Sequence, residues 1–380
     1  MKKIYLDNNS TTPLDPIVLD CMMPFFKEKF GNASSSTHSY GWEASAAIEI
    51  SRETIANLIN ANPEQIIFTS GATESNNLSI LGAYNKLNKK NTNIITLSTE
   101  HKAVLDVCNR VEKKYNNKII YLNPEKNGII DINKIINSIN DNTFLVSVML
   151  VNNEIGVIQP INKIGKICKE KNIIFHVDAA QALGKIPIDV KKMNVDLLSL
   201  SGHKIYGPKG IGALYIKNKN LIESQIVGGN QEYNLRSGTL PVPLIVGLGK
   251  AAEIYTNNDF ANNETKKILE LRNMLVKNIL KKHPNTIING DLKNRIAGNI
   301  NLTFPFLNGK SIINKMPEIA ISSGSACTSS NSTASHVLLN IGHSKLFANS
   351  SIRIGIGRFN TIEDIEIASN SILNALKLIT

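Results

Sequence analysis

From about Gln65 to Gly212 the sequence alternates short apolar runs with longer stretches of helical periodicity. Each apolar run has the length of a buried strand, and each longer stretch has the length of a helix. Strands and helices that alternate along a chain build a mainly parallel sheet with helices on both of its faces. The sequence therefore predicts an α/β fold around a large, doubly wound, mainly parallel sheet.

The expected elements can be located along the chain. We expect strands at residues 65–69, 93–98, 118–122, 144–151, 173–178, 195–200 and 210–216, and helices at residues 16–29, 39–60, 132–139 and 264–280. Beyond about residue 259 the pattern changes to one long amphipathic helix, short strands and further helices. We therefore expect a large domain of residues 12–258 and a smaller α+β domain made of residues 1–11 and 259–380.

The composition is typical of a soluble globular protein, with 42% hydrophobic and 19% charged residues. Asp7 follows Met1 too soon for a secretory signal peptide, and no uncharged apolar run approaches the roughly 20 residues of a membrane helix. We expect a cytoplasmic protein without membrane association. The net charge of +11 comes from lysines scattered along the chain rather than from one basic stripe, so we expect no specific nucleic-acid partner.

The four cysteines are too few and too far apart for a disulfide framework or a zinc site. Cys21, Cys108 and Cys168 fall in helix-like segments, where we expect buried thiols that act as small hydrophobic groups. Cys327 lies in the run 322–335 of small polar residues, which could pack little. In isolation this run indicates a surface loop with an incidental cysteine, although a thiol on a mobile tether also suits the transfer of sulfur.

Two polar residues follow predicted strands. Lys204 comes after the run 195–200 and the small residues Ser201 and Gly202, and Asp178 closes the preceding strand. Because parallel strands end at one crevice, the two side chains can face a common ligand. An amine that forms a Schiff base and a carboxylate that pairs with a protonated ring nitrogen suit pyridoxal phosphate. Taken singly, Lys204 is also compatible with a surface turn, and Asp178 with a cap of the following turn.

Residues 70–74 close another predicted strand and open a helix, so that Gly71 and Thr73 lie at a helix N-terminus. Free backbone N–H groups and a hydroxyl at such an end attract phosphate. An ordinary Thr/Glu helix cap would explain the same residues.

His101 also follows a predicted strand, where a lone histidine is more often a satisfied polar residue than a functional one.

Several segments in one order resemble those of cysteine desulfurases of the IscS and NifS type. The similar segments are 5–7, 70–75, 99–104, 152–156, 176–181, 201–210 and 351–353. The resemblance covers nearly the whole chain and implies a pyridoxal-phosphate-dependent transferase of fold type I. Its activity would be the conversion of L-cysteine to L-alanine.

The resemblance also implies a role for each candidate residue of the cofactor site. Lys204 would hold the cofactor, Asp178 would pair with its ring nitrogen, and His101 would stack on the ring and help to move protons. Gln181 and Asn153 would lie near the phenolic oxygen. The implied phosphate contacts are Gly71, Ala72, Thr73, Ser201, His203 and, from the neighbouring subunit, Thr239. A contact from the neighbouring subunit implies a homodimer.

For the substrate, the resemblance implies that Arg353 grips the carboxylate through a two-pronged salt bridge, with Asn153 beside it. Cys327, in a Ser-Gly-Ser-Ala-Cys-Thr-Ser motif of the long-loop group, would take the sulfur as a persulfide. The implied catalytic residues are thus Cys327, Lys204 and His101. No resident metal is implied, and Cys327 would contact an iron–sulfur cluster only transiently.

The implied acceptors of the persulfide are an iron–sulfur scaffold protein and sulfur-relay proteins of tRNA thiolation. Tyr233 and Asn234 depart from the Arg-Gly that is usual before Thr239, so the family does not predict the polar contacts of this loop. The chain also ends soon after its last expected helix, whereas many relatives carry a further tail, and we expect weaker scaffold docking.

Two other functions remain open at this point. A selenocysteine lyase or another fold-type I aminotransferase would keep Lys204 and Asp178 but would not depend on Cys327 for ordinary cysteine turnover. An inactive protein of the same fold that binds nucleic acid or a scaffold would not bind the cofactor.

Overall fold

The computed structural model describes residues 2–87, 91–115, 117–323 and 334–379, so Cys327 lies outside the described residues. The larger sheet has seven strands in the order β2 (Ile66–Thr69), β8 (Gly212–Ile216), β7 (Leu197–Ser201), β6 (Ile174–Asp178), β5 (Thr143–Ser147), β3 (Asn93–Leu97) and β4 (Lys118–Leu122). β8 is antiparallel to both of its neighbours, and all other neighbouring pairs are parallel. The predicted α/β fold with a mainly parallel sheet is confirmed.

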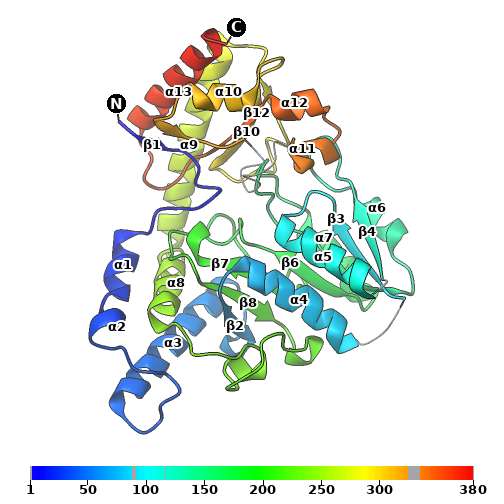
Figure 1. The fold of residues 1–380 in the computed structure, drawn as a ribbon, viewed down its shortest axis with the longest axis vertical. Coiled ribbons are helices and arrows are strands. Elements are labelled where there is room, and N and C mark those ends of the chain that lie inside the picture. Colours follow the sequence, from blue (N-terminus) through cyan, green and yellow to red (C-terminus); the bar gives the residue numbers. More distant parts are fainter. Residues whose placement is uncertain (1, 88–90, 116, 324–333, 380) are drawn as a thin grey trace.

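Helices cover both faces of this sheet (Figure 1). One face packs on α3 (Ser39–Leu58), α6 (Ile132–Ser138), α7 (Ile161–Glu170) and α8 (Val242–Ile254), and the other on α4 (Ala72–Leu87) and α5 (Lys102–Tyr115). Successive strand residues alternate between the two cores: Ile66 and Phe68 pack in one, and Ile67 packs in the other. Because both faces are buried, the strands are continuous apolar runs rather than alternating ones.

The second, smaller sheet lies near both chain ends in Figure 1. It is antiparallel, in the order β12 (Ser351–Gly355), β10 (Asn299–Thr303) and β9 (Ile287–Ile288), and β1 (Ile4–Tyr5) pairs separately with β11 (Ile319–Ala320). α9 (Asn258–Lys282), α10 (Gly309–Asn314) and α13 (Ile362–Lys377) share a hydrophobic core with these strands. Ile4 and Leu6 belong to the same core, which ties the N-terminus to the C-terminal part of the chain.

The expected helix at residues 16–29 is wrong in one respect, because it is two helices. α1 (Pro16–Met22) begins at Asp15, whose Oδ1 accepts the N–H of Ile17 at 2.9 Å, and α2 (Pro24–Lys27) begins directly after Met23. Pro24 has no N–H for the i to i−4 ladder, so the first helix ends before it.

The expected strand 144–151 is also too long, because β5 ends at Ser147. On the side of β6 the backbone pairing continues beyond Ser147, because the N–H groups of Val148 and Leu150 donate to His176 O and Asp178 O. On the other side it is replaced by a side chain, since the N–H of Met149 donates to the Glu100 carboxylate at 2.9 Å.

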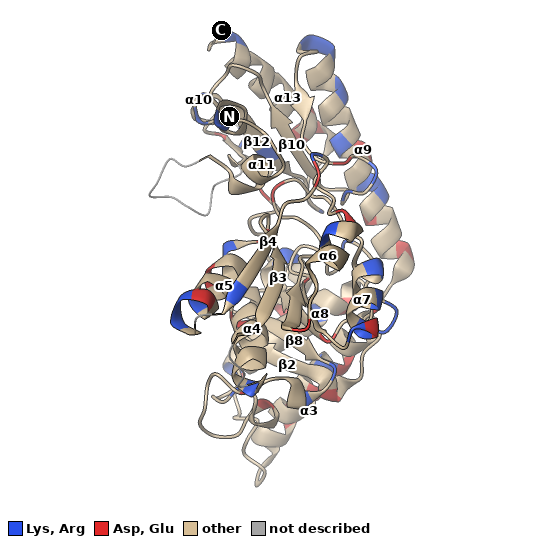
Figure 2. Ribbon diagram, turned by 90° about the vertical axis from the view of Figure 1, so that its right-hand side faces the viewer, with Lys and Arg blue, Asp and Glu red and all other residues tan. Residues whose placement is uncertain are grey.

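Cys108 and Cys168 are buried in helices as expected, but Cys21 is only half-buried, because α1 lies at the edge of the fold. Lysine and arginine residues are spread over α5, α7 and α9 and are not confined to one element (Figure 2). None of the described helices combines the length and the apolar composition needed to cross a membrane.

Candidate active site

A cavity of about 460 Å³ lies at the carboxyl ends of β6 and β7, beside the N-terminus of α4. Most of the candidate residues line it: Gly71, Ala72, Thr73, His101, Asn153, Asp178, Gln181, Ser201, His203, Lys204 and Arg353. They come from segments far apart in the sequence, and the sheet brings their ends together as expected for parallel strands. Thr239 does not line this cavity, and Cys327 is outside the described residues.

Lys204 is placed by a single 3-10 turn, η2 (Gly202–Lys204), which follows β7 directly. Its Nζ donates to two backbone oxygens of the N-terminal segment, Asn9 O at 2.8 Å and Ser10 O at 2.5 Å. These acceptors hold the amine inside the cavity at a defined position. The sequence could not predict these two acceptors, because every residue type provides a backbone carbonyl oxygen.

Asp178 is the last residue of β6 and is buried. Its Oδ1 accepts the N–H of Ala180 at 3.0 Å, and its Oδ2 accepts Asn76 Nδ2 at 2.8 Å. Asn76, on the buried face of α4, was not predicted. The sequence signal that could have identified Asn76 is a polar residue among apolar neighbours on one face of a helix. The two donors fix the position of the carboxylate at the cavity.

The N-terminus of α4 forms one side of the cavity. Gly71 has φ +149°, a conformation that side chains rarely adopt, and a Cβ there would meet no atom within 4 Å. A Cβ on Gly212 would lie 2.6 Å from Gly71 Cα, so the close approach of β8 requires glycine there. The first N–H groups of a helix have no partner within the helix, and they make this open, positive end suitable for phosphate.

Two histidines beside the cavity are neutral near pH 7. Burial and the charge of Lys204 lower the pKa of His101, although Asp178 opposes this effect. His101 Nδ1 accepts the N–H of Ala103 at 3.1 Å, so the neutral ring carries its proton on Nε2. Burial, Lys204 and Lys209 lower the pKa of His203 to about 4.

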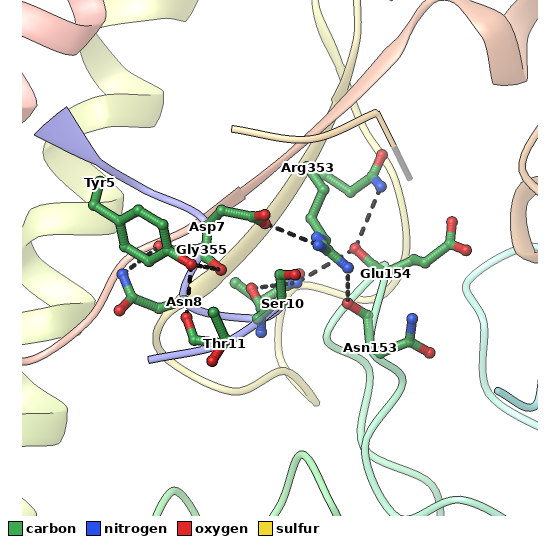
Figure 3. A network of polar contacts seen from close by, with 12 residues as sticks. Tyr5, Asp7, Asn8, Ser10, Thr11, Asn153, Glu154, Arg353 and Gly355 are labelled. Carbon is green, nitrogen blue, oxygen red and sulfur yellow. Dashed lines mark hydrogen bonds and ion pairs between the residues drawn. The ribbon is translucent and has the colours of Figure 1, made fainter. Parts of the chain in front are cut away.

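Arg353 reaches the cavity from β12 (Figure 3). Its Nη2 forms an ion pair of 2.8 Å with Asp7 Oδ1, and its Nη1 donates to Asn153 O at 3.1 Å. Among the described residues, Arg353 Nε and Asn153 Oδ1 are buried without a hydrogen-bond partner. A buried cation with an unsatisfied N–H beside the cavity suits an anionic group of a ligand.

Two buried carboxyl groups near the cavity were not predicted. Burial raises the pKa of Glu154 to about 7, although a hydrogen bond from Ser335 and the charge of Arg353 oppose it. Burial also raises the pKa of Glu100 well above its ordinary value, and Glu100 Oε2 has no partner among the described residues. Ser335, whose Oγ donates to Glu154 Oε2, lies two positions after residue 333, the last residue of the segment outside the described residues.

The loop before Thr239 is anchored by groups other than the Arg-Gly usual in the family. Buried Glu232 pairs with Arg52 at 2.7 Å, and Lys219 Nζ lies 3.2 Å from the ring centroid of Tyr233. Glu232, Tyr233 and Asn234 all have positive φ, which asparagine tolerates better than most residues. Thr239 is exposed at the end of this loop.

A family model described as Aminotransferase class-V matches residues 4–367. The chain therefore belongs to the aminotransferase class-V family. It is 53% identical to a protein named Cysteine desulfurase IscS from Ehrlichia chaffeensis, over 98% of this chain and 91% of that protein. This relation places the chain among the cysteine desulfurases of the IscS and NifS type within the family.

Two solved structures are similar over most of their length. One, titled NIFS-LIKE PROTEIN, has a TM-score of 0.92 and 35% identity, and covers 99% of this chain and 100% of that one. The other, titled SspA in complex with cysteine, has a TM-score of 0.83 and 39% identity, and covers 94% of this chain and 100% of that one. The fold type expected from the sequence is thereby confirmed.

Proposed function

We propose that this chain is a pyridoxal-phosphate-dependent cysteine desulfurase that converts L-cysteine to L-alanine and leaves the sulfur as a persulfide on Cys327. The observation that carries the proposal is the meeting of Lys204, Asp178 and the N-terminus of α4 in one cavity. The relative named Cysteine desulfurase IscS, matched over 98% of this chain, supports the same activity.

The residues present fit the cofactor. An amine, a buried carboxylate and a helix N-terminus match the aldehyde, the ring nitrogen and the phosphate of pyridoxal phosphate. In the proposal, Lys204 holds the aldehyde, Asp178 the ring nitrogen and Gln181 the phenolic oxygen. The phosphate contacts are Gly71, Ala72, Thr73, Ser201, His203 and Thr239 of the partner subunit. When bound, the cofactor supplies an electron sink for charge that develops at the substrate carbon.

The chain's own groups bind the substrate and move protons. Arg353, held by Asp7 and Asn153, receives the substrate carboxylate. Lys204 Nζ, once free of the cofactor, takes the α-proton of cysteine. His101, neutral and with its proton on Nε2, can donate that proton to a group of the substrate in the cavity.

Cys327 removes the sulfur in this proposal. Its thiolate attacks the substrate sulfur, so that an S–S bond forms while the substrate C–S bond breaks, and a proton on the freed carbon completes alanine. Burial raises the pKa of Cys108 and of Cys168 to about 12, so neither is a thiolate at neutral pH. Cys21 is half-buried within α1 and has no loop to carry it to the cavity.

The proposal includes a homodimer in the cytoplasm. The exposed side chains of Phe26, Phe30, Tyr40 and Trp42, on and beside α2 and α3, offer an apolar surface for a second copy. Thr239 is exposed at the end of its loop and so is free to contact a neighbouring subunit. An iron–sulfur scaffold protein and a tRNA-thiolation relay are the proposed acceptors of the persulfide.

The test is to add cysteine to the protein reconstituted with pyridoxal phosphate and to assay alanine and protein-bound persulfide together. Equal amounts of both in the first turnover support the desulfurase. Alanine without persulfide would favour the selenocysteine lyase alternative, and a keto acid that retains the sulfur would favour an aminotransferase; the named relatives favour neither. A protein that stays colourless with the cofactor would contradict the proposal altogether.

A further inference from the structure

Lys185 lies next to the cofactor site without lining it. It lines a small cavity of about 40 Å³, and Asn9 lines both this cavity and the active-site cavity. Lys185 Nζ donates to Gln181 Oε1 at 3.0 Å, and Gln181 lines the active-site cavity. A half-buried lysine thus donates a hydrogen bond to a residue that is proposed to contact the cofactor.

The hydrogen bond from Lys185 to Gln181 Oε1, at 3.0 Å, is shorter than the one that Asn9 Nδ2 makes to the same oxygen at 3.4 Å, and both hold the Gln181 amide in one orientation. An ammonium group has donors but no acceptor, so it must bond the amide oxygen and not the amide nitrogen. Gln181 Nε2 then donates to Asn9 O at 2.7 Å, and its second N–H remains for the cavity. Asn9 O also accepts Lys204 Nζ at 2.8 Å, so one backbone oxygen joins Gln181 to the proposed cofactor lysine.

We propose that Lys185 is a positioning residue of the cofactor site, which orients Gln181 so that its Nε2–H, and not its oxygen, faces the phenolic oxygen of the cofactor. The inference rests on the proposed function. It adds a residue that touches neither cofactor nor substrate and acts through Gln181.

The surroundings of Lys185 support this role. Among the described residues no carboxylate oxygen lies within ion-pair distance of its Nζ, and Glu264, the carboxylate whose charge acts on it, is bound by Arg358 at 3.2 Å. Tyr206 and Tyr255 line the same small cavity. Burial, together with the charges of Lys204 and Arg353, lowers the pKa of Lys185 to about 7, while Glu264 opposes this. Lys185 is thus protonated below about pH 7, and the partner of its Nζ is an amide oxygen rather than a carboxylate.

The experiment compares Lys185→Met and Lys185→Arg, with Lys191→Met as the matched control. Lys191 is an exposed lysine in the same connection between β6 and β7. Two quantities are measured: the dissociation constant of pyridoxal phosphate from the apoprotein, and the midpoint pH of the absorbance change of the bound cofactor. A lost hydrogen bond predicts cofactor binding about 3- to 10-fold weaker for Lys185→Met.

The midpoint pH should also rise in Lys185→Met, because the deprotonated phenolic oxygen loses an oriented donor. Arginine, like lysine, carries hydrogen-bond donors but no acceptor, so Lys185→Arg should keep the wild-type dissociation constant and midpoint pH. Lys191→Met should change neither value. In a Gln181→Ala background, Lys185→Met should have no further effect on either quantity, because Lys185 acts through Gln181.

A Lys185→Met protein with wild-type affinity and midpoint would overturn the inference, and so would a full, additive effect in the Gln181→Ala background. Thermal unfolding of the apoproteins checks that each variant folds, and Lys185→Gln replaces Lys185→Met if the latter does not. Failure of the proposed function itself would appear differently, in the wild-type protein, either as no cofactor binding or as cysteine turnover without a protein-bound persulfide.

Discussion

Arg353 and Asp7 form an ion pair of 2.8 Å at the edge of the active-site cavity, although they are 346 positions apart in the sequence (Figure 3). The pair joins β12 to the N-terminal segment that also supplies Asn9 O and Ser10 O to Lys204. One arm of the guanidinium is thereby held in place before any substrate arrives. A preorganised arginine binds a carboxylate with a smaller loss of side-chain freedom.

Replacing Arg353 with lysine should raise KM for cysteine about 10- to 100-fold, because a lysine cannot make the two-pronged bond to a carboxylate. Steady-state kinetics measure this effect. Arg358→Lys is the control, since Arg358 is held by Asp15 and Glu264 and does not line the active-site cavity. An unchanged KM in Arg353→Lys would remove Arg353 from the substrate site.

Lys204→Ala should abolish covalent attachment of the cofactor and nearly all turnover, because Lys204 is the amine that the Asn9 and Ser10 carbonyls hold in the cavity. Borohydride reduction of the wild-type protein followed by peptide mapping locates the attachment site. Lys209 lines the same cavity, so Lys209→Ala is the matched control and should keep the attachment. A pyridoxyl label on Lys209 instead of Lys204 would show that the assignment is wrong.

Glu154 should make the protein less stable as the pH rises. Its folded-state pKa of about 7 is above the ordinary value of 4.5, so the folded protein binds this proton more tightly than the unfolded chain does. The contribution is fully present below about pH 4.5 and is lost as the pH rises toward 7, a change on the order of 3 kcal/mol.

Glu154→Gln keeps an acceptor for Ser335 but cannot ionise, so its free energy of unfolding should depend less on pH between 5 and 8. Urea unfolding at several pH values measures this, with the exposed Glu53→Gln as the control. A Glu154→Gln protein whose unfolding free energy changes with pH as steeply as that of the wild type would contradict the prediction.

The sequence predicted those parts of the site that follow apolar strands. Asp178, Lys204 and His101 could be found because a polar residue at or within a few positions of the end of a buried run lies at the carboxyl end of a parallel strand. The helix N-terminus at Gly71 could be found because small and polar residues open it. These features are local, so a single stretch of sequence contains them.

The parts that the sequence did not predict depend on residues far apart in the chain. The oxygens of Asn9 and Ser10 are backbone atoms, and their contact with Lys204 depends on how the N-terminal segment crosses the cavity. Asn76 and Lys185 act on other site residues through one hydrogen bond each, which no motif records. The break between α1 and α2 was visible at Pro24 but was outweighed by the helical periodicity around it.

The most direct test of the central claim is the Cys327→Ala variant, assayed for alanine and protein-bound persulfide after the addition of cysteine, with Cys21→Ala as the control. Cys327→Ala should keep its bound cofactor and still respond to cysteine in its absorbance spectrum, yet form no persulfide and essentially no alanine, while Cys21→Ala should behave as the wild type does. Release of alanine from Cys327→Ala at close to the wild-type rate would contradict the desulfurase mechanism.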